Sequence, residues 1–309
     1  MTHQTLTLPD GRTLEYVVSG ANDKHANDDF ALLYFHGTVG SSLPYVQTSD
    51  ACRQAGIKLI TPSRPGYGGS TRHKGRRVVD VVADMEALLA ELKVRSCVAV
   101  GHSGGGPHAM ACAAKLQACV AAVVIAGAVP VDAEGLDYAA GQGETNVEEW
   151  LAMQQGEPAV RAYCTQEATS MLAADARTLT DALASLLPAI DKDALRANNC
   201  SMGQHLVDQI QDGLRDGQID GWVDDDLELM QEWGFDLTTE VKVPTHVYQG
   251  SEDRMVPLAH GEWLAGHLPA GLVNKRVVHG QGHISILGLA MDEVLALAGA
   301  LKRSEEGLV

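Results

Sequence analysis

The chain has 309 residues, of which 45% are hydrophobic, and it carries a formal net charge of −17. This length and apolar content suffice for a large core, either in one domain with an insertion or in two domains. The acidic balance makes nucleic acid and anionic membranes poor partners. Because the sequence has neither a membrane-spanning apolar run nor a signal-like N-terminus, we expect a soluble cytoplasmic protein.

The negative charge is concentrated in one segment. Residues 132–240 contain 23 acidic and 5 basic residues, whereas the remainder contains 17 and 18. Such a segment is typical of solvated helical faces, so we expect it to aid solubility rather than to steer a substrate. The six cysteines form no C-x-x-C pair. We interpret them as buried free thiols rather than as disulfides or a metal site.

The first 131 residues alternate between strand-like and helix-like hydrophobic patterns. Residues 4–19 form two runs around an Asp10-Gly11 turn, which predicts a hairpin, and a polar loop over 21–29 follows. Further along the chain we predict strands at 30–35, 57–60, 97–100 and 120–129, and helices ending at 55 and covering 78–92 and 106–116.

From about residue 132 the pattern is helical, without a convincing strand. The expected helices cover 147–155, 158–174, 179–187, 202–214 and 227–233. Alternation then resumes with strands at 245–249 and 275–278 and helices at 258–267 and 284–301. We therefore expect a mostly parallel sheet with helices on both faces, built from residues 1–131 and 240–309, with residues 132–239 inserted as a helical cap.

The sequence Gly101-His102-Ser103-Gly104-Gly105 lies between the predicted strand at 97–100 and the predicted helix at 106–116. A G-x-S-x-G motif between a strand and a helix is typical of a nucleophile elbow, in which a strained turn lifts the serine hydroxyl off the sheet. Ligands of such sheets bind at the carboxyl ends of the strands. We therefore expect Ser103 to lie at the functional edge.

A serine hydroxyl is a weak nucleophile and needs a base, which in turn needs an orienting acid. Two loops at the same sheet edge carry candidates for these roles. The loop at 250–257 contains Glu252 and Asp253, and the loop at 279–283 contains His279 and His283.

At this point the chain resembles the α/β-hydrolase superfamily over nearly its full length. Five motifs occur in the family's order: H-G before a small-residue loop (36–41), R-P-G-Y-G-G-S (64–70), G-H-S-G-G (101–105), G-x-x-D-x-x-V-P (250–257) and G-x-G-H (280–283). The resemblance implies the α/β-hydrolase fold. It also implies that Ser103 is the nucleophile, His283 the general base and then acid, and Asp253 the group that orients His283.

The same resemblance implies an oxyanion hole formed by the backbone N–H groups of Thr38 and Gly104. We expect His36 and Gly37 to brace the oxyanion loop, and His102 and Arg64 to have structural roles. The family spacing favours Asp253 over Glu252 and His283 over His279. We expect no cofactor and no metal site, because no two histidines lie at i, i+4 on one helix with a third ligand nearby.

Differences between this sequence and specialised branches of the superfamily narrow the class of reaction that we expect. Epoxide hydrolases and haloalkane dehalogenases resemble this chain but use aspartate at the elbow, where this chain has Ser103. Proline iminopeptidases tend to carry Gly-Pro-Gly after the H-G pair and tryptophan after the serine, whereas this chain has Thr38-Val39-Gly40 and Gly104. An aminopeptidase is therefore the weaker hypothesis, although an acidic cap could receive a substrate ammonium.

The cap carries large apolar residues and an aspartate triplet. We interpret most of the former as packing between cap helices rather than as pocket lining: Trp150, Met153, Tyr163, Met171, Trp222, Met230 and Trp233. Residues 221–226 and 233–237 are interpreted as the return from cap to sheet. Asp224, Asp225 and Asp226 lack the spacing of a calcium loop, so we predict a solvated acidic turn there.

Together these features predict a cofactor-independent serine hydrolase that cleaves a carboxylic ester or lactone of small to medium size through an acyl-enzyme on Ser103. A neutral or cationic leaving group fits the acidic cap better than an anionic one. We expect a monomer or homodimer with no nucleic-acid or membrane partner. Two alternatives remain: amide, peptide or carbon–carbon bond hydrolysis or a lyase reaction on the same triad, and a ligand-binding protein with low turnover.

Overall fold

The computed structural model describes residues 2–21 and 29–305, so most of the polar loop predicted at 21–29 lies outside the described residues. The strands form one sheet in the order β1-β2-β4-β3-β5-β6-β7-β8. Their bounds are β1 Gln4–Thr7, β2 Thr13–Gly20, β3 Phe30–Phe35, β4 Lys58–Pro62, β5 Ser96–His102, β6 Cys119–Ile125, β7 Thr245–Gly250 and β8 Val273–Val278. β2 pairs antiparallel with β1 and β4, and the other neighbours pair in parallel, which confirms the predicted mostly parallel sheet.

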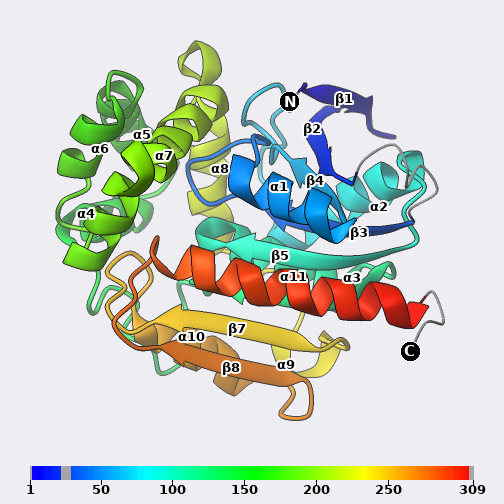
Figure 1. Cartoon of the computed structure of the whole chain (residues 1–309). Coiled ribbons are helices and arrows are strands. Elements are labelled where there is room, and N and C mark those ends of the chain that lie inside the picture. The colour runs from blue at the N-terminus through cyan, green and yellow to red at the C-terminus, as the bar shows by residue number, and fades with distance from the viewer. Residues whose placement is uncertain (1, 22–28, 306–309) are drawn as a thin grey trace.

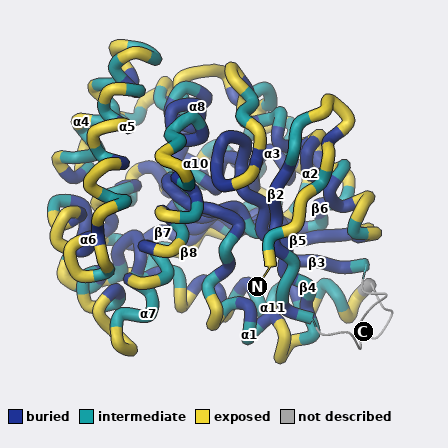
Figure 2. Tube along the Cα trace, turned by 90° about the horizontal axis from the view of Figure 1, so that it is seen from above, coloured by how far each residue is buried: buried dark blue, intermediate teal, exposed yellow. Residues whose placement is uncertain are grey.

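Helices cover both faces of the sheet (Figure 2). The helices of the core are α1 Val46–Ala55, α2 Val81–Glu91, α3 Gly106–Lys115, α10 Leu258–His267 and α11 Ile286–Glu305. α1 and α11 pack on one face, and α2, α3 and α10 pack on the other. Each face buries its own apolar cluster, because alternate residues of a strand point to opposite sides of the sheet. In β5, for example, Ala99 faces the cluster with α2 and α3, whereas Val98 and Val100 face the cluster with α1 and α11.

Between β6 and β7 the described chain contains helices and loops but no strand. The helices are α4 Glu144–Met153, α5 Glu157–Leu172, α6 Ala176–Ala182, α7 Ala189–Gly213, α8 Asp220–Leu229 and α9 Leu237–Glu240. Figure 1 shows α4 to α7 gathered beyond one edge of the sheet. They pack around a third apolar cluster, which also includes Tyr67 and Ile284 of the core. We keep the name predicted cap for residues 132–239, since its exact limits remain a prediction.

Several predicted elements differ from those observed. The helix predicted at 227–233 is observed as α8, which begins at Asp220 and ends at Leu229. β6 ends at Ile125 rather than at 129, because the chain leaves the strand at Ala126, which has a left-handed φ of 47°. α7 begins at Ala189 rather than at 202, although its backbone departs from helical geometry at residues 197–200. The aspartate triplet lies within α8 rather than in a turn, and the prediction of a solvated acidic turn is therefore wrong.

All six cysteines are free thiols, and five of them are buried, as their apolar surroundings predicted. None of the helices in the described part of the chain combines the length and the apolar character needed to cross a membrane.

Candidate active site

Ser103 lies at the end of β5, where the sheet order changes direction. β3 and β4 continue the sheet on one side of β5, and β6 to β8 continue it on the other. The backbone of Ser103 has a left-handed φ of 54°, which a non-glycine residue adopts only under strain and which is typical of a nucleophile elbow. A Cβ on Gly101 would lie 2.8 Å from the Cα of Gly106, so the tight turn requires glycine at position 101.

Two neighbouring loops bring an acid and a histidine to the same edge. His283 follows β8, and its Nδ1 lies 2.8 Å from Oδ2 of Asp253, which follows β7. The other oxygen of Asp253 accepts hydrogen bonds from the N–H groups of Met255 and Val256 at 2.8 and 2.9 Å. Gln249 also donates to Oδ2 of Asp253, at 3.1 Å. Because these donors fix the carboxylate, Asp253 is placed to orient the imidazole of His283.

The charges around His283 favour its protonated form. Burial lowers the pKa of the imidazole, but the charge and hydrogen bond of Asp253, together with the charge of Asp191, outweigh burial and leave this pKa raised. The ring of His102 lies 4.7 Å from that of His283, centroid to centroid, and its Nε2 lies 3.2 Å from the backbone oxygen of His283. Burial, with the charge of His283, lowers the pKa of His102 to about 3, so His102 is neutral and donates to that carbonyl.

The rival acid and base lie elsewhere. Glu252 is exposed, and its carboxylate accepts a hydrogen bond from Ser251. His279 is also exposed, at the turn after β8, and does not line the cavity beside Ser103. Of these four candidates, His283 and Asp253 are the two that are buried and hydrogen-bonded to each other, and His283 lines the cavity beside Ser103.

The loop at 36–38 is held from behind by buried side chains. His36 donates from Nδ1 to the carbonyl of Gly37 at 2.8 Å and accepts at Nε2 from the N–H of Arg64 at 3.1 Å. Arg64 is 1% exposed and donates to the carbonyls of His36 and Gly37 and to Oγ1 of Thr38. The N–H of Thr38 belongs to the same peptide unit as the carbonyl of Gly37, which accepts a hydrogen bond from Arg64. Because the C=O and N–H of a trans peptide point in opposite directions, the N–H of Thr38 points away from Arg64.

Gly104 lies against this loop. A Cβ at position 104 would come within 3.1 Å of Cβ and 3.2 Å of the backbone N of Thr38. The N–H of Gly104 is in the first turn of a short helical segment, Ser103–Gly105, and such N–H groups lack intrahelical partners. The two N–H groups expected to form the oxyanion hole are therefore neighbours beside Ser103.

This contact gives a first prediction. We expect Gly104→Ala to lower kcat/KM for ester hydrolysis by about 10²-fold, because the added methyl displaces Thr38 and with it one oxyanion donor. Gly266→Ala is the matched control, since a Cβ there meets nothing within 4 Å. Kinetics on both variants, with thermal unfolding to check their stability, test the prediction. Equal kcat/KM for the two variants would contradict it.

Behind the loop at 36–38 lies a buried cluster of opposite charges that the sequence analysis missed. Asp225 is 3% exposed and accepts from Arg64, Arg76, Tyr67 and the hydroxyl of Thr38. Burial raises the pKa of Asp225, but the two guanidinium groups outweigh burial and hold this pKa below its ordinary range. One end of this cluster thus holds the hydroxyl of Thr38, whose N–H is a candidate oxyanion donor.

The neighbouring acids of α8 are paired in the same way. Asp224 binds Arg72 through two hydrogen bonds of 2.8 Å, and Glu228 lies 3.0 Å from Arg76 and 3.2 Å from His108. His108, Asp225 and Glu228 approach one another closely enough to hold a cation, but two arginines already supply positive charge there. We therefore interpret the group as an ion-pair network. The arginine-rich stretch at 64–77 was the sequence signal for it.

A cavity of about 200 Å³ opens beside Ser103 and His283. The predicted cap forms much of its wall, and five of its seven large apolar residues line the cavity. Four of these five, Met153, Tyr163, Met171 and Trp222, also pack in the apolar cluster between the cap helices, as predicted. The cavity is lined by Trp150, Met153, Tyr163, Met171 and Trp222. Of the other two, Met230 is exposed, and Trp233 belongs to the buried apolar cluster that also includes residues of α2 and α3. The helices of the predicted cap converge over Ser103, so their inner apolar faces enclose the cavity.

Two carboxyl groups also face this cavity. Glu149 accepts a hydrogen bond of 2.7 Å from the indole of Trp222, and Asp226 is 4% exposed and accepts only a long contact from the thiol of Cys164, among the described residues. Burial raises the pKa of Glu149 to about 7, assisted by the charges of other acids. Burial and the charge of Glu149 raise the pKa of Asp226. The cavity therefore has an acidic wall that holds a proton near neutral pH.

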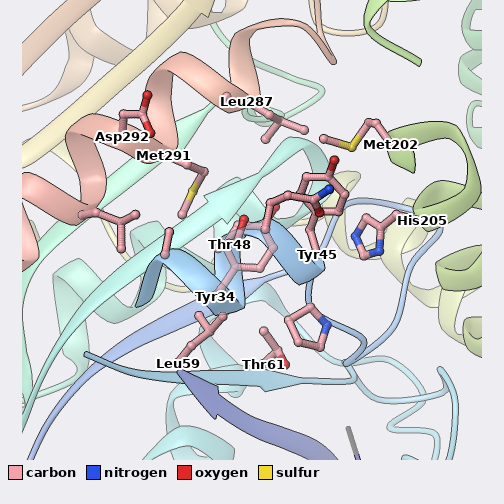
Figure 3. A pocket seen from close by; sticks show the side chains of 15 residues that line it. Tyr34, Tyr45, Thr48, Leu59, Thr61, Met202, His205, Leu287, Met291 and Asp292 are labelled. Carbon is pink, nitrogen blue, oxygen red and sulfur yellow. The ribbon is translucent and has the colours of Figure 1, made fainter. Parts of the chain in front are cut away.

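A second cavity, of about 160 Å³, lies between α1, α7 and α11 (Figure 3). Its wall includes Tyr34, Met202, His205, Leu287 and Met291. It contains none of Ser103, Asp253 and His283, and we assign it no part in catalysis.

Comparison with known proteins agrees with this architecture. Residues 31–288 match the family model described as alpha/beta hydrolase fold, and the chain belongs to this family. It is 32% identical over 127 residues to an uncharacterised hydrolase, YcgS, of Bacillus subtilis (strain 168), and 33% identical over 82 residues to an epoxide hydrolase of Caballeronia sordidicola. These matches span 41% and 26% of this chain, and 41% and 25% of the two relatives.

Solved structures cover nearly the whole chain at low sequence identity. The epoxide hydrolase CorEH superposes with a TM-score of 0.70 at 16% identity, covering 97% of this chain and 99% of that one. An esterase from Thermogutta terrifontis gives 0.62 at 16% identity, covering 100% and 99%. A protein described as an N-acyl homoserine lactone degrading enzyme gives 0.65 at 18% identity, covering 96% and 99%. At these identities the likeness establishes the fold and leaves the reaction to the chemistry of the site.

Proposed function

We propose that the protein is a serine hydrolase that cleaves carboxylic esters or lactones, with Ser103 as nucleophile, His283 as general base and then acid, and Asp253 as the orienting group. The observation that carries this proposal is the meeting of a strained serine at the end of β5 with the hydrogen-bonded His283–Asp253 pair at one cavity. Each element of the triad stands on a different loop, all at the carboxyl edge of the sheet.

The proposed mechanism uses these groups in sequence. The hydroxyl of Ser103 attacks the carbonyl carbon while His283 accepts its proton. The N–H groups of Thr38 and Gly104 stabilise the oxyanion of the tetrahedral intermediate. Protonated His283 then gives its proton to the leaving alcohol, and a water molecule activated by His283 hydrolyses the acyl-enzyme. The carboxylate of Asp253 stabilises the imidazolium formed in both steps.

The relatives include epoxide hydrolases as well as esterases, and the residue at position 103 supports the esterase side. Epoxide hydrolases that resemble this chain use aspartate at the elbow, where this chain has Ser103. Ser103 has only a hydroxyl there, which needs a base such as His283 and is suited to attack on a carbonyl. The paired N–H groups beside Ser103 support the same choice, because a carbonyl oxygen gains charge during acyl transfer.

Active-site labelling tests this proposal directly. We expect a fluorophosphonate probe to label the wild type and not Ser103→Ala, and p-nitrophenyl esters to be hydrolysed only by the wild type. A series of esters with increasing acyl length would define the size of the cavity. Equal labelling of both proteins would refute Ser103 as the nucleophile. Labelling without ester turnover would direct the search to amides, carbon–carbon bonds or ligands that are not turned over.

The acidic wall of the cavity supports a preference for neutral or cationic leaving groups. A substrate cation near Glu149 and Asp226 would be attracted once these groups ionise, and Trp150 and Trp222 offer aromatic faces beside them. We predict that the ratio of kcat/KM for acetylcholine to that for its uncharged isostere, dimethylbutyl acetate, rises with pH through about 7, where Glu149 ionises. Taking the ratio cancels the titration of His283, which both esters share.

Substitution of Glu149 supplies the control. Glu149→Gln should lower this ratio by about tenfold at high pH and remove its rise through about pH 7. The trimethylammonium group donates no hydrogen bond and is attracted to the carboxylate by charge alone, and a tenfold change corresponds to about 1.4 kcal/mol. Glu148→Gln is the matched variant, since Glu148 is exposed and does not line the cavity. A ratio that is flat with pH in the wild type would exclude Glu149 as a recognition group.

A further inference from the structure

Asp191 connects the predicted cap to the loop that carries His283. It lies in the first turn of α7 and is fully buried, at 0% exposed. One carboxylate oxygen, Oδ2, accepts from the backbone N–H of His283 at 2.8 Å, and the other, Oδ1, accepts from the N–H of Ser285 at 2.8 Å. The carboxylate therefore holds the backbone on both sides of Ile284 in a fixed position.

The position of Asp191 also explains why the residue before His283 is glycine. A Cβ on Gly282 would come within 2.6 Å of both Cγ and Oδ1 of Asp191, closer than real Cβ atoms approach other groups. The φ of Gly282 lies outside the left-handed range, so its backbone conformation does not itself demand glycine. The second glycine of the G-x-G-H motif is thus explained by Asp191, a residue about 90 positions earlier in the chain.

A purely local role for Asp191 explains less of what is observed. An acidic residue in the first turn stabilises a helix through the macrodipole. Yet both hydrogen bonds of the Asp191 side chain leave the helix and go to the histidine loop. Among the described residues no lysine or arginine forms a salt bridge with this buried carboxylate. The cation that its charge can stabilise is His283 in its protonated form.

We propose that Asp191 is a positioning residue for catalysis: from the predicted cap it holds the His283 loop in its active geometry, so that the base is correctly placed only while α7 is docked on the core. The proposal rests on the proposed role of His283. Figure 1 shows the arrangement on which it depends, with the first turn of α11 directed toward the predicted cap. Movement of α7 away from the core would release the N–H groups of His283 and Ser285 together.

The charged and titratable groups that face His283 come from three elements. Asp253 contacts the ring from the β7–α10 loop, and Asp191 lies against the backbone from α7. His102, at the end of β5, lies beside the ring at a tilt of 42°. Loss of the charge of Asp191 therefore leaves Asp253 to act alone against burial, and the pKa of His283 falls. The acid limb of the pH profile of kcat/KM reports this pKa and should move to lower pH.

The test compares Asp191→Asn with Asp193→Asn, which changes an exposed residue of the same helix. Asparagine keeps one acceptor but faces the second N–H with an NH₂ group. For Asp191→Asn we expect kcat to fall by about 10²-fold with KM unchanged, because a small displacement of a catalytic base costs this much. We also expect the acid limb to move to lower pH and the amides of His283 and Ser285 to exchange faster with solvent. Asp193→Asn should match the wild type.

A double-mutant cycle separates positioning from general destabilisation. Gly282→Ala should impair kcat strongly in the wild-type background, because the methyl collides with the Asp191 carboxylate. In an Asp191→Ala background this carboxylate is absent, so the added effect of Gly282→Ala should be small. Effects that simply add would overturn the steric coupling. If Asp191→Ala does not fold, the Asp191→Asn and Asp193→Asn pair still decides the proposal.

The readouts distinguish this inference from the proposed function. NMR titration of His283, assigned by comparison with His283→Asn, measures the imidazole pKa in the intact protein without any turnover. If the wild type lacks Ser103-dependent hydrolysis, the proposed function fails, and a lower pKa with faster amide exchange in Asp191→Asn still supports the contact. Wild-type kinetics, pKa and amide protection in Asp191→Asn would overturn the inference while leaving the triad intact.

Discussion

Replacement of His283 by alanine is expected to lower kcat for ester hydrolysis by about 10⁴- to 10⁶-fold. The imidazole is the one base of the described residues that is bound to a buried, fully hydrogen-bonded carboxylate beside Ser103. In the proposed mechanism, the serine hydroxyl of this variant has no proton acceptor, and the leaving alcohol has no proton donor. Single-turnover and steady-state kinetics with a p-nitrophenyl ester would measure the loss.

The double variant Ser103→Ala/His283→Ala tests whether the two residues act together. Residues that act as one catalytic unit lose nearly all their benefit at the first substitution, so the double variant should be no slower than either single one. His279→Ala serves as the matched control, since His279 is exposed and lies four residues earlier in the same loop. Losses that multiply would show that Ser103 and His283 act separately and would refute the triad.

The second large effect is expected on stability. Asp225→Ala should lower the free energy of unfolding by about 3–5 kcal/mol, because it leaves the buried guanidinium groups of Arg64 and Arg76 without their shared carboxylate. That is a large part of the roughly 5–15 kcal/mol that stabilises a typical domain. Chemical denaturation of the variant and the wild type would measure the difference. Because Asp225 and Arg64 also hold the hydroxyl of Thr38, whose N–H is a candidate oxyanion donor, activity should fall as well.

Asp220→Ala provides the comparison for Asp225→Ala. Asp220 begins the same helix and also pairs with arginines, but its side chain is 37% exposed, so its loss should cost at most about 1 kcal/mol. The lowered pKa of Asp225 implies a pH dependence as well. Its contribution to stability is present above about pH 4, where aspartate in an unfolded chain ionises, and is lost as the pH falls through the lower folded-state pKa. Similar losses for both variants would contradict this account.

Much of the fold could be predicted from hydrophobic period. The runs at 30–35 and 97–100 are solidly apolar because these parallel strands are buried on both faces, and the apolar spacing at 78–92 is that of a helix lying on the sheet. Predictions were weaker in the predicted cap. α7 and α8 pack against the core as well as against other helices, so their buried faces include charged residues such as Asp191 and Asp225. These charged residues interrupt the helical spacing of apolar residues on which the prediction depends.

The candidate site could be located from the sequence because its residues lie in short local motifs. The elbow at 101–105 needs small residues around Ser103, and the loops with Asp253 and His283 each follow a strand. The cavity wall could not be predicted in the same way. Whether Trp150 packs against a neighbour or faces a cavity depends on how the helices of the predicted cap converge, and no local pattern records that.

The sequence by itself determined the alternation of strands and helices and the elbow, because each depends on residues close together in the chain. The choice of Asp253 and His283 among the candidate acids and bases came from the resemblance to the α/β-hydrolase superfamily. Only the tertiary structure decided the fate of the acidic residues in the predicted cap. A run of aspartates is solvated unless cations from elsewhere meet it, and Arg64, Arg72 and Arg76 reach α8 from a segment some 150 residues away. Likewise, only the tertiary structure brings Asp191 to the loop that carries His283, about 90 residues later in the chain. Burial of a carboxylate depends on its partners, and folding alone brings such distant partners together.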